Sequence, residues 1–503
     1  MGGNDMGIQF RRFCAVAWLI ATAAWPQMVA AGVAEGKAAF EAKEYATALK
    51  ELMPEAEAGD PVAQSIIGLM YDEGVGVKMD TRVALQWYRK SALQGNAFAE
   101  KSLGDWYRLG IVVDKDERVA ADWYRKSAEH GDVQAQNILG GLYLNGSGVE
   151  KSEREAFQWF IKAAEQGDIA AQSTVGDMYQ AGKGVQMNNR NAFQWFSKAA
   201  ERGEAYSQAK LGDMYKFGLG VEKDVRLAAQ WYRKAAEQGD LIAMNKIGLM
   251  YKAGDGIEKD ERVAFKWMRN AAERGNFDSQ VNLGAMYSSG TGVEKDERLA
   301  VEWYRKAAEK GSADAQNNLG TMYENGTGVL QDYAEAAKLY RKAAILGSGY
   351  GQRNLARMYR NGTALEEDAI RSYAWFNLSA AADDPHPDAQ KERDDLAATL
   401  SREAIAEGQR LSAAWKVGSD LGPSKIKASK RPVPKPVAAA ARNDDDGGWP
   451  SRPAKTPGVT SCRTQCNNGD CRRTYDDGRH VHYQAQQKWN SMNNQFEWDS
   501  GTC

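Results

Sequence analysis

Apolar and polar positions follow a pattern that returns every 36 residues along this chain. Tyrosine occupies one position of the pattern nine times in succession, and tryptophan occupies another seven times before Leu339 and Trp375 complete the series. Glycine holds a third position eight times, from Gly68 to Gly320, and Ala356 stands at the ninth. Three residue types that keep one register through nine copies indicate a repeat solenoid.

Each copy contains two segments with helical periodicity, as the eighth copy illustrates. Its first segment has an apolar stripe that ends at a glycine: Ala315, Leu319, Met322, Tyr323 and Gly326. Its second segment has another: Ala336, Leu339, Tyr340, Ala343, Ala344 and Gly347. A good N-cap residue precedes every such segment except the one after Glu204. The pattern therefore predicts an all-α superhelical solenoid of nine helical pairs over residues 60–383, preceded by a half-repeat over 35–58 and closed by one helix over 388–416.

The recurring string is (A/S)-x-x-x-L-G-x-M-Y-x-x-G-x-G-V followed by A-x-x-W-Y-x-K-A-A-x-x-G, and it is clearest over residues 279–311. This string resembles the Sel-1-like repeat, a helical-pair unit related to tetratricopeptide repeats. The resemblance covers residues 36–416, with local departures such as Val112 in place of a loop glycine. It implies a scaffold for protein–protein interactions, and the exported bacterial members of the family imply a place in the cell envelope.

The first 31 residues have the features of a signal peptide. Arg11 and Arg12 precede an apolar segment from Phe13 to Ala24, and small residues follow at the expected cleavage site. The apolar segment is short for a bilayer span, so we expect export to the periplasm or cell envelope, or secretion, with no membrane span after cleavage. An uncleaved anchor and a twin-arginine signal are the alternatives.

Four cysteines lie within the last 42 residues, in a predicted module over residues 461–503: Cys462, Cys466, Cys471 and Cys503. An even number of clustered cysteines in an exported chain predicts two disulfides, and the sequence leaves three pairings open. Strand signals flank the turn at 476–478, so we expect a small β-rich fold. His480 and His482 would share one face of a strand, which leaves zinc binding as an alternative.

The segment over residues 417–460 holds seven of the twelve prolines together with several lysines. This composition predicts a disordered linker between the solenoid and the module.

Charge and motifs point away from enzymes and nucleic acid. The chain has 65 Lys and Arg against 67 Asp and Glu, so its bulk charge does not favour nucleic acid. It contains no H-E-x-x-H and no G-x-S-x-G string. His130 takes the place of Gln, Arg or Lys in other copies and is interpreted as a surface variant. We therefore expect no catalytic residues, no cofactor and no metal site.

A candidate binding surface comes from the positions that vary between copies. Counting the cap as position 1 of the first helix, positions 3, 6, 7, 10, 13 and 14 change freely, and positions 3, 7, 10 and 14 form one helical stripe. Position 7 carries Lys210, Lys246, Asn282, Asn318 and Asn354. Position 3 offers anchors in Phe98, Tyr206, Ile242 and Tyr350, and a basic patch is formed by Arg353, Arg357 and Arg360.

Because first helices line the inner curve of tetratricopeptide-like solenoids, this stripe predicts a groove for a protein or peptide partner. The sequence thus favours a non-enzymatic adaptor of the cell envelope. The alternative is an envelope protein whose C-terminal module binds glycan or cell wall through Trp489, Phe496 and Trp498. Neither the identity of the partner nor the oligomeric state follows from the sequence.

Overall fold

The computed structural model describes residues 31–427 and, in the C-terminal segment, the backbone of five short strands. The chain divides into two compact units, Met1–Pro432 and Val433–Cys503. The predicted signal peptide therefore lies outside the described residues, apart from Ala31, and so does the linker beyond residue 427.

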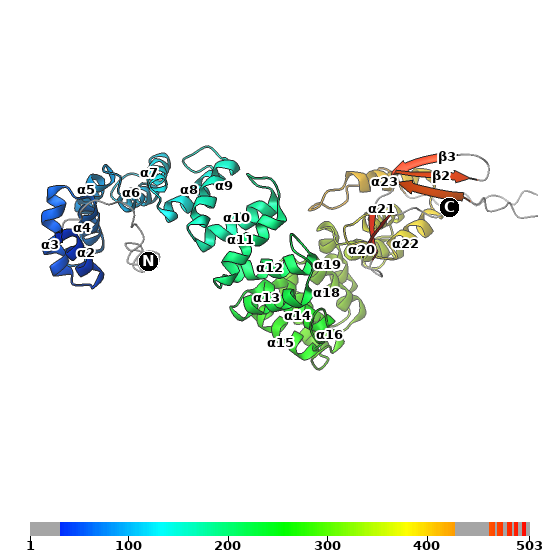
Figure 1. Cartoon of the computed structure of the whole chain (residues 1–503). Coiled ribbons are helices and arrows are strands. Elements are labelled where there is room, and N and C mark those ends of the chain that lie inside the picture. The colour runs from blue at the N-terminus through cyan, green and yellow to red at the C-terminus, as the bar shows by residue number, and fades with distance from the viewer. Residues whose placement is uncertain are drawn as a thin grey trace, which may run out of the picture. The chain divides into compact units, whose positions relative to one another are not determined.

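The described part of the first unit is built from 22 helices that form a solenoid (Figure 1). The first helices of the nine repeats are α4 (Pro61–Glu73), α6 (Ala97–Leu109), α8 (Val133–Asn145), α10 (Ile169–Ala181), α12 (Ala205–Phe217), α14 (Leu241–Ala253), α16 (Phe277–Ser289), α18 (Ala313–Asn325) and α20 (Gly349–Asn361). The second helices are α5 (Thr81–Ala92), α7 (Glu117–Glu129), α9 (Glu153–Glu165), α11 (Asn189–Glu201), α13 (Val225–Glu237), α15 (Glu261–Glu273), α17 (Glu297–Glu309), α19 (Tyr333–Ile345) and α21 (Ala369–Ala380).

Capping side chains and glycines set where these helices begin and end. The cap residue of every repeat helix accepts a bond from the first turn, as Asp60 does from the N–H of Ala63 at 2.8 Å. Glu204, which the sequence analysis excluded as a cap, does the same for the N–H groups of Tyr206 and Ser207. Each first helix ends on a glycine with a φ of 66–77°, a conformation that an L side chain rarely adopts.

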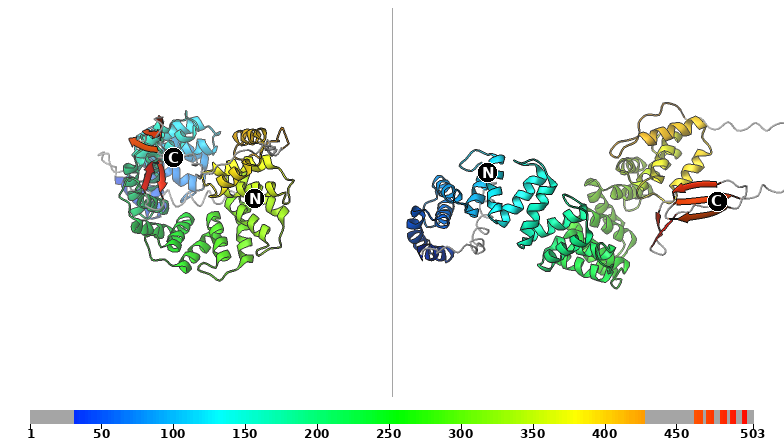
Figure 2. Two further views of the ribbon diagram at one scale, coloured as in Figure 1. Left: turned by 90° about the vertical axis from the view of Figure 1, so that its right-hand side faces the viewer. Right: turned by 45° about the horizontal axis from the view of Figure 1, so that its top comes forward.

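The glycine ladder is where the two helices of a repeat meet. Gly212 on α12 faces Tyr232 on α13, and a Cβ built on the glycine would lie 2.5 Å from two carbon atoms of the ring. The same contact recurs along the solenoid, with tyrosine, phenylalanine or methionine as the large partner. Pairs of helices joined in this way stack one on the next along a curved path (Figure 2).

A second ladder, of glutamines, joins successive repeats. In seven of the nine repeats the glutamine at position 5 of the first helix donates from Nε2 to the carbonyl eight residues earlier, at 3.0–3.3 Å. That carbonyl belongs to the second helix of the preceding repeat. These buried bonds therefore satisfy a helix end while they fix one repeat against the next.

The two ends of the solenoid differ from the sequence predictions. The predicted half-repeat is a full helical pair, α2 (Ala31–Glu41) and α3 (Tyr45–Ala58). The predicted closing helix is two helices, α22 (Ala389–Ala397) and α23 (Arg402–Ala414), joined by a turn that buries Leu400.

The prediction of a disordered linker from residue 417 is wrong for residues 417–427. Leu421 is buried in the last core cluster, Gly418 donates its N–H to the carbonyl of Ile345 at 2.8 Å, and Lys425 donates its N–H to Glu407 at 2.6 Å. This segment therefore covers the end of the array.

The second unit contains five strands: β1 (Cys462–Asn467), β2 (Asp470–Tyr475), β3 (His480–Gln484), β4 (Gln487–Asn490) and β5 (Gln495–Trp498). β2 pairs antiparallel with β1 and with β3, and the register places Cys466 opposite Cys471. The side chains of these strands lie outside what the structure describes. The disulfides, the zinc alternative at His480 and His482, and the exposure of Trp489, Phe496 and Trp498 stay predictions.

Within residues 31–427 and the described strands, no helix is long and apolar enough to cross a bilayer.

Candidate partner-binding face

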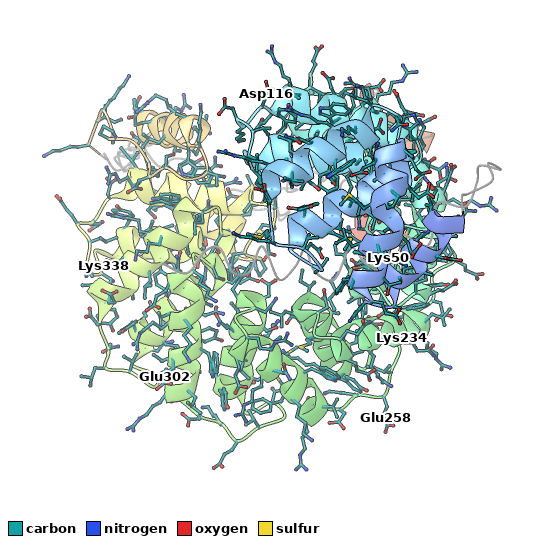
Figure 3. The ribbon with its side chains drawn as sticks, turned by 90° about the vertical axis from the view of Figure 1, so that its left-hand side faces the viewer. Lys50, Asp116, Lys234, Glu258, Glu302 and Lys338 are labelled. Carbon is teal, nitrogen blue, oxygen red and sulfur yellow. The ribbon has the colours of Figure 1, made fainter. Side chains whose placement is uncertain are left out.

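The first helices lie on the inner side of the curve that the solenoid follows. Figure 3 looks at the solenoid from its N-terminal side and places Glu302 on α17 and Lys338 on α19 at the outer edge. Both residues belong to second helices and both are exposed. The opposite face of each pair, formed by the first helices, therefore faces inward.

A row of exposed side chains crosses five neighbouring first helices at position 3. Its members are Tyr206, Ile242, Asp278, Asp314 and Tyr350. The two apolar members at one end are Tyr206, 41% exposed, and Ile242, 57% exposed. We call this set the position-3 row. Their exposure on neighbouring first helices makes the position-3 row the candidate surface for a partner.

Three of the four predicted anchors at position 3 contact neighbouring rings, and Tyr206 does so edge-on against Phe196 with ring centroids 6.5 Å apart. Phe98 packs edge-on against Tyr88, with ring centroids 6.1 Å apart, and it is half-buried. Phe98 is therefore a packing residue, and its prediction as an anchor is wrong. Tyr350 lies beside His386, with ring centroids 4.8 Å apart, but it keeps 39% of its surface exposed.

The predicted lysines at position 7 are tied to the preceding repeat. Lys246 donates to the carboxylate of Asp213 at 2.5 and 2.7 Å. Lys210 pairs with Asp177 at 3.1 Å, and the hydroxyl of Tyr206 also donates to that carboxylate at 2.8 Å. These half-exposed ion pairs hold adjacent first helices together and fix the ring of Tyr206.

The predicted asparagines at position 7 also bond to neighbouring side chains. Asn282 donates to Asn245 at 2.9 Å, and Asn354 donates to Asn317 at 2.9 Å. Asn318 accepts a bond from Asn317 at 3.3 Å. Asn245 and Asn317, which accept the first two of these bonds, stand at position 6 of their helices and are buried. The interpretation of positions 6 and 7 as outside the packing set is therefore wrong, because they connect the repeats.

One of the three arginines predicted to form a basic patch is engaged in an ion pair within the solenoid. Arg353 forms a two-bond ion pair with Glu392 of α22 at 2.7 and 2.9 Å, and only 16% of its side chain is exposed. It fastens the closing helix to the last repeat. Arg357 and Arg360 lie one turn and two turns further along α20, and Arg360 also lies over the ring of Phe376.

The middle of the position-3 row is acidic. Asp278 and Asp314 are exposed on adjacent first helices, and neither carboxylate forms an ion pair with another described residue. Partial burial raises the pKa of Asp278 above its ordinary value, and the charge of Asp314 raises it further. Two like charges that face one another in this way favour a positively charged group between them.

α12 and α14 carry further exposed apolar side chains at later positions of the same stripe. Phe217 is 63% exposed at position 14 of its helix, and Leu249 is 37% exposed at position 10. Positions 3, 7, 10 and 14 form one stripe, so these residues extend the surface begun by Tyr206 and Ile242. The inner face of the fifth and sixth repeats is thus the most apolar exposed part of the stripe.

One functional group was missed by sequence reasoning. His130 is no isolated surface variant, because its Nδ1 lies 2.8 Å from Oε2 of the buried Glu100. The signal was present in the sequence, since Glu100 replaces a glutamine of the ladder in the same repeat in which His130 replaces the usual residue.

Asp132, the N-cap of α8, should make the stability of the third repeat depend on pH. Burial raises its pKa to about 6, against the opposing bonds from the first turn of α8. A raised pKa means that its contribution to stability is complete below about pH 4 and is lost as the pH rises to about 6. Asp132→Asn keeps a capping oxygen and should stabilise the protein at pH 7 by roughly 1–3 kcal/mol, with little gain at pH 4.

Denaturant unfolding at the two pH values measures this difference, and Asp168→Asn at the equivalent half-buried cap of α10 is the matched control. If Asp132→Asn had the same effect at both pH values, ionisation of the Asp132 carboxyl group would not destabilise the folded protein.

Among the described residues no group of three or more His, Cys, Asp or Glu side chains is placed to hold a metal ion.

Known proteins share this repeat architecture. The family model described as Sel1 repeat matches nine consecutive segments, from residues 61–96 to residues 349–384. The crystal structure of c5321, a protective antigen of uropathogenic Escherichia coli strains with an SLR fold, is 32% identical with a TM-score of 0.54, and the match covers 76% of this chain and 90% of that one. A Sel1 repeat protein from Oxalobacter formigenes is 33% identical with a TM-score of 0.51, over 62% of this chain and 90% of that one.

The comparison with curated proteins gives no match. The nine matched segments occupy more than half of the chain and coincide with the helical pairs from α4 to α21. The chain therefore belongs to the Sel1 repeat family.

Proposed function

We propose that this protein is a non-enzymatic scaffold that binds a protein or peptide partner along the inner face of its solenoid. Proteins built from Sel1 repeats are generally interaction scaffolds, and the described helices form an extended surface. The observation that carries the proposal is the exposure of Tyr206 and Ile242 on neighbouring first helices. Aromatic and aliphatic side chains in such positions supply most of the energy in protein interfaces.

The ion pairs beneath the row support the same surface. Asp177 accepts from both Tyr206 and Lys210, so the tyrosine ring is held in place before any partner arrives. A side chain that is already ordered loses little entropy on binding. The site is therefore preorganised at its apolar end.

Charge defines the chemistry of the partner. A segment that crosses the first helices along the position-3 row would meet two apolar side chains and then the two exposed carboxylates of Asp278 and Asp314. The complementary segment carries apolar side chains followed by one or two basic residues. The row ends at Tyr350, which offers a second apolar contact.

We further propose that the protein acts in the cell envelope after export. The proposal rests on the signal-peptide features of residues 1–31 and on the four cysteines clustered after residue 461. In that compartment Cys462, Cys466, Cys471 and Cys503 would be oxidised in pairs. Thiol labelling of the protein recovered from the envelope tests this, and free thiols with bound zinc would contradict it.

Site-specific photo-crosslinking in the producing cell tests the binding surface. A photoreactive residue in place of Ile242 on the inner face should trap a partner. The same residue in place of Leu330, which is 88% exposed in the loop before α19, should trap none. Equal products from both positions would refute the inner face as the binding surface. Products only from positions after residue 461 would favour a binding role for the C-terminal module.

A further inference from the structure

A residue just after the second helix lies close to the ladder position on the first helix of the same repeat. In three repeats a glutamine at this place donates to the ladder glutamine 30 residues earlier: Gln94 to Gln64, Gln166 to Gln136 and Gln238 to Gln208, at 2.7–2.9 Å. Gln94 also donates to the carbonyl of Gly59, which belongs to the preceding helical pair. Neutral amides thus hold the ladder glutamine from within its own repeat in three repeats.

The second repeat replaces both glutamines with titratable residues. Glu100 takes the ladder position on α6 and is 1% exposed, and His130 takes the position after α7 with 48% of its side chain exposed. Nδ1 of His130 lies 2.8 Å from Oε2 of Glu100. A buried carboxylate is thus bonded to a half-exposed imidazole where three other repeats have two amides.

Both residues belong to the second repeat and lie at its edge toward the first repeat. In seven other repeats the ladder glutamine donates to the carbonyl eight residues earlier, which for Glu100 is the carbonyl of Ala92 on α5. An ionised carboxylate has no proton to donate there. The imidazole also lies against the turn between α5 and α6, since a Cβ built on Gly95 would be 3.2 Å from its Cε1.

Other charges around Glu100 come from the elements packed against α6. On α7, Lys126 favours the ionised carboxylate and Glu129 disfavours it, both less than the bond from His130. The N-cap of α8 adds the buried carboxyl group of Asp132. On α5, Arg89 donates to Tyr107, and Lys90 lies over the ring of Trp87, so both cations have partners of their own.

We propose that Glu100 and His130 form a proton-controlled latch that tightens the boundary between the first and second repeats as the pH falls below neutral. Protonation of Glu100 at lower pH supplies the O–H that can bond to the Ala92 carbonyl, as the glutamine of other repeats does.

The direction of the pH effect follows from the difference in the pKa of Glu100 between the folded and unfolded states. Burial raises the pKa of Glu100 above its ordinary value, with the bond from His130 opposing the shift. A carboxyl group with a raised pKa stabilises the fold most when it is protonated, and this stability is lost as the pH rises through the folded pKa. The boundary therefore becomes firmer in mild acid, the opposite of the usual acid destabilisation of ion-paired carboxylates.

Hydrogen exchange of the full-length protein at pH 8 and pH 5.5, corrected for intrinsic exchange rates, tests the latch. Long repeat arrays open locally, so each boundary reports on itself. Amides at residues 95–99 should exchange more slowly at pH 5.5 than at pH 8. Residues 203–207, at the boundary closed by Gln208 and Gln238, should show no such gain.

Two double variants separate the latch from a merely structural contact. Glu100→Gln with His130→Gln reproduces the natural pair of the other repeats and should abolish the gain at residues 95–99 without loss of folding. Gln208→Glu with Gln238→His transplants the pair and should create the gain at residues 203–207. The proposal would be overturned if the native protein showed no gain in protection at residues 95–99. It would also be overturned if the gain persisted in the variant with Glu100→Gln and His130→Gln.

Discussion

Replacing Gly212 by leucine should unfold the fifth repeat and cost more than the roughly 1–3 kcal/mol that overpacking of a core typically costs. Even a Cβ at this position would lie 2.5 Å from the ring of Tyr232, which is 1% exposed. The ring has no room to withdraw, because its hydroxyl donates to Asp213 at 2.6 Å. Denaturant unfolding should show a lost or separated transition for the repeats around the substitution.

A matched glycine in the same kind of helix controls for helix propensity. Gly141 on α8 has no atom within 4 Å of an added Cβ. Gly141→Ala should therefore stabilise the protein by about 0.5–1 kcal/mol, because alanine has the higher helix propensity. If Gly212→Leu and Gly141→Ala had similar effects, the glycine ladder would owe its presence to something other than the contact with the second helix.

The glycine ladder shows how much of this fold the sequence predicts. A residue type repeated at a fixed period can only mean a repeated contact, so the repeat, its two helices and their caps follow from spacing alone. The identity of the contact does not, because the partner of Gly212 lies on the other helix of the pair. Only the structure assigns Tyr232 to it.

The ends were predicted less well because the periodic signal ends there. Gly36 on α2 faces Leu52 on α3 as a ladder glycine would, but it does not keep the 36-residue spacing to Gly68. The pair also lacks the ladder tyrosine, so the sequence indicated only half of it. Residues 417–427 look like a linker by composition, yet Leu421 is buried at the end of the array. A single apolar residue that covers an exposed core leaves no pattern in the sequence.

Variation between copies proved an imperfect guide to exposure. Position 7 varies because different repeats connect to their neighbours by different chemistry. Lys246 forms an ion pair with Asp213, whereas Asn282 uses an amide bond to Asn245. Position 3 varies and is also exposed on α12 and α14. Sequence variability is shared by solvent-facing residues and by paired contacts that change together, and only coordinates separate the two.

Glu100 and His130 are a second case in which variation between copies misled the interpretation. Each looks like a harmless variant of a repeat position when considered alone. They are 30 residues apart, the spacing at which Gln64 and Gln94 also meet, so the coupled change was visible once that contact was known.

Replacing Tyr206 and Ile242 together by alanine should abolish partner binding while the solenoid stays folded. Buried anchors at an interface contribute about 2 kcal/mol or more each, so the double substitution should weaken binding by about a thousandfold. The fold should tolerate the change because Tyr206 is 41% exposed and Ile242 is 57% exposed. Capture from an envelope extract, compared with the unaltered protein, measures the loss, and circular dichroism verifies the helices.

The control variant must remove exposed apolar surface elsewhere on the solenoid. Leu93, 78% exposed after α5, and Leu330, 88% exposed in a loop, serve this purpose when both are changed to alanine. This variant should capture the partner as well as the native protein does. Capture retained by Tyr206→Ala with Ile242→Ala would remove the apolar end of the row from the interface. If capture were then lost only in the variant with Asp278→Lys and Asp314→Lys, binding would be assigned to the acidic pair. The reversed charge would repel the basic residue that the partner is proposed to carry.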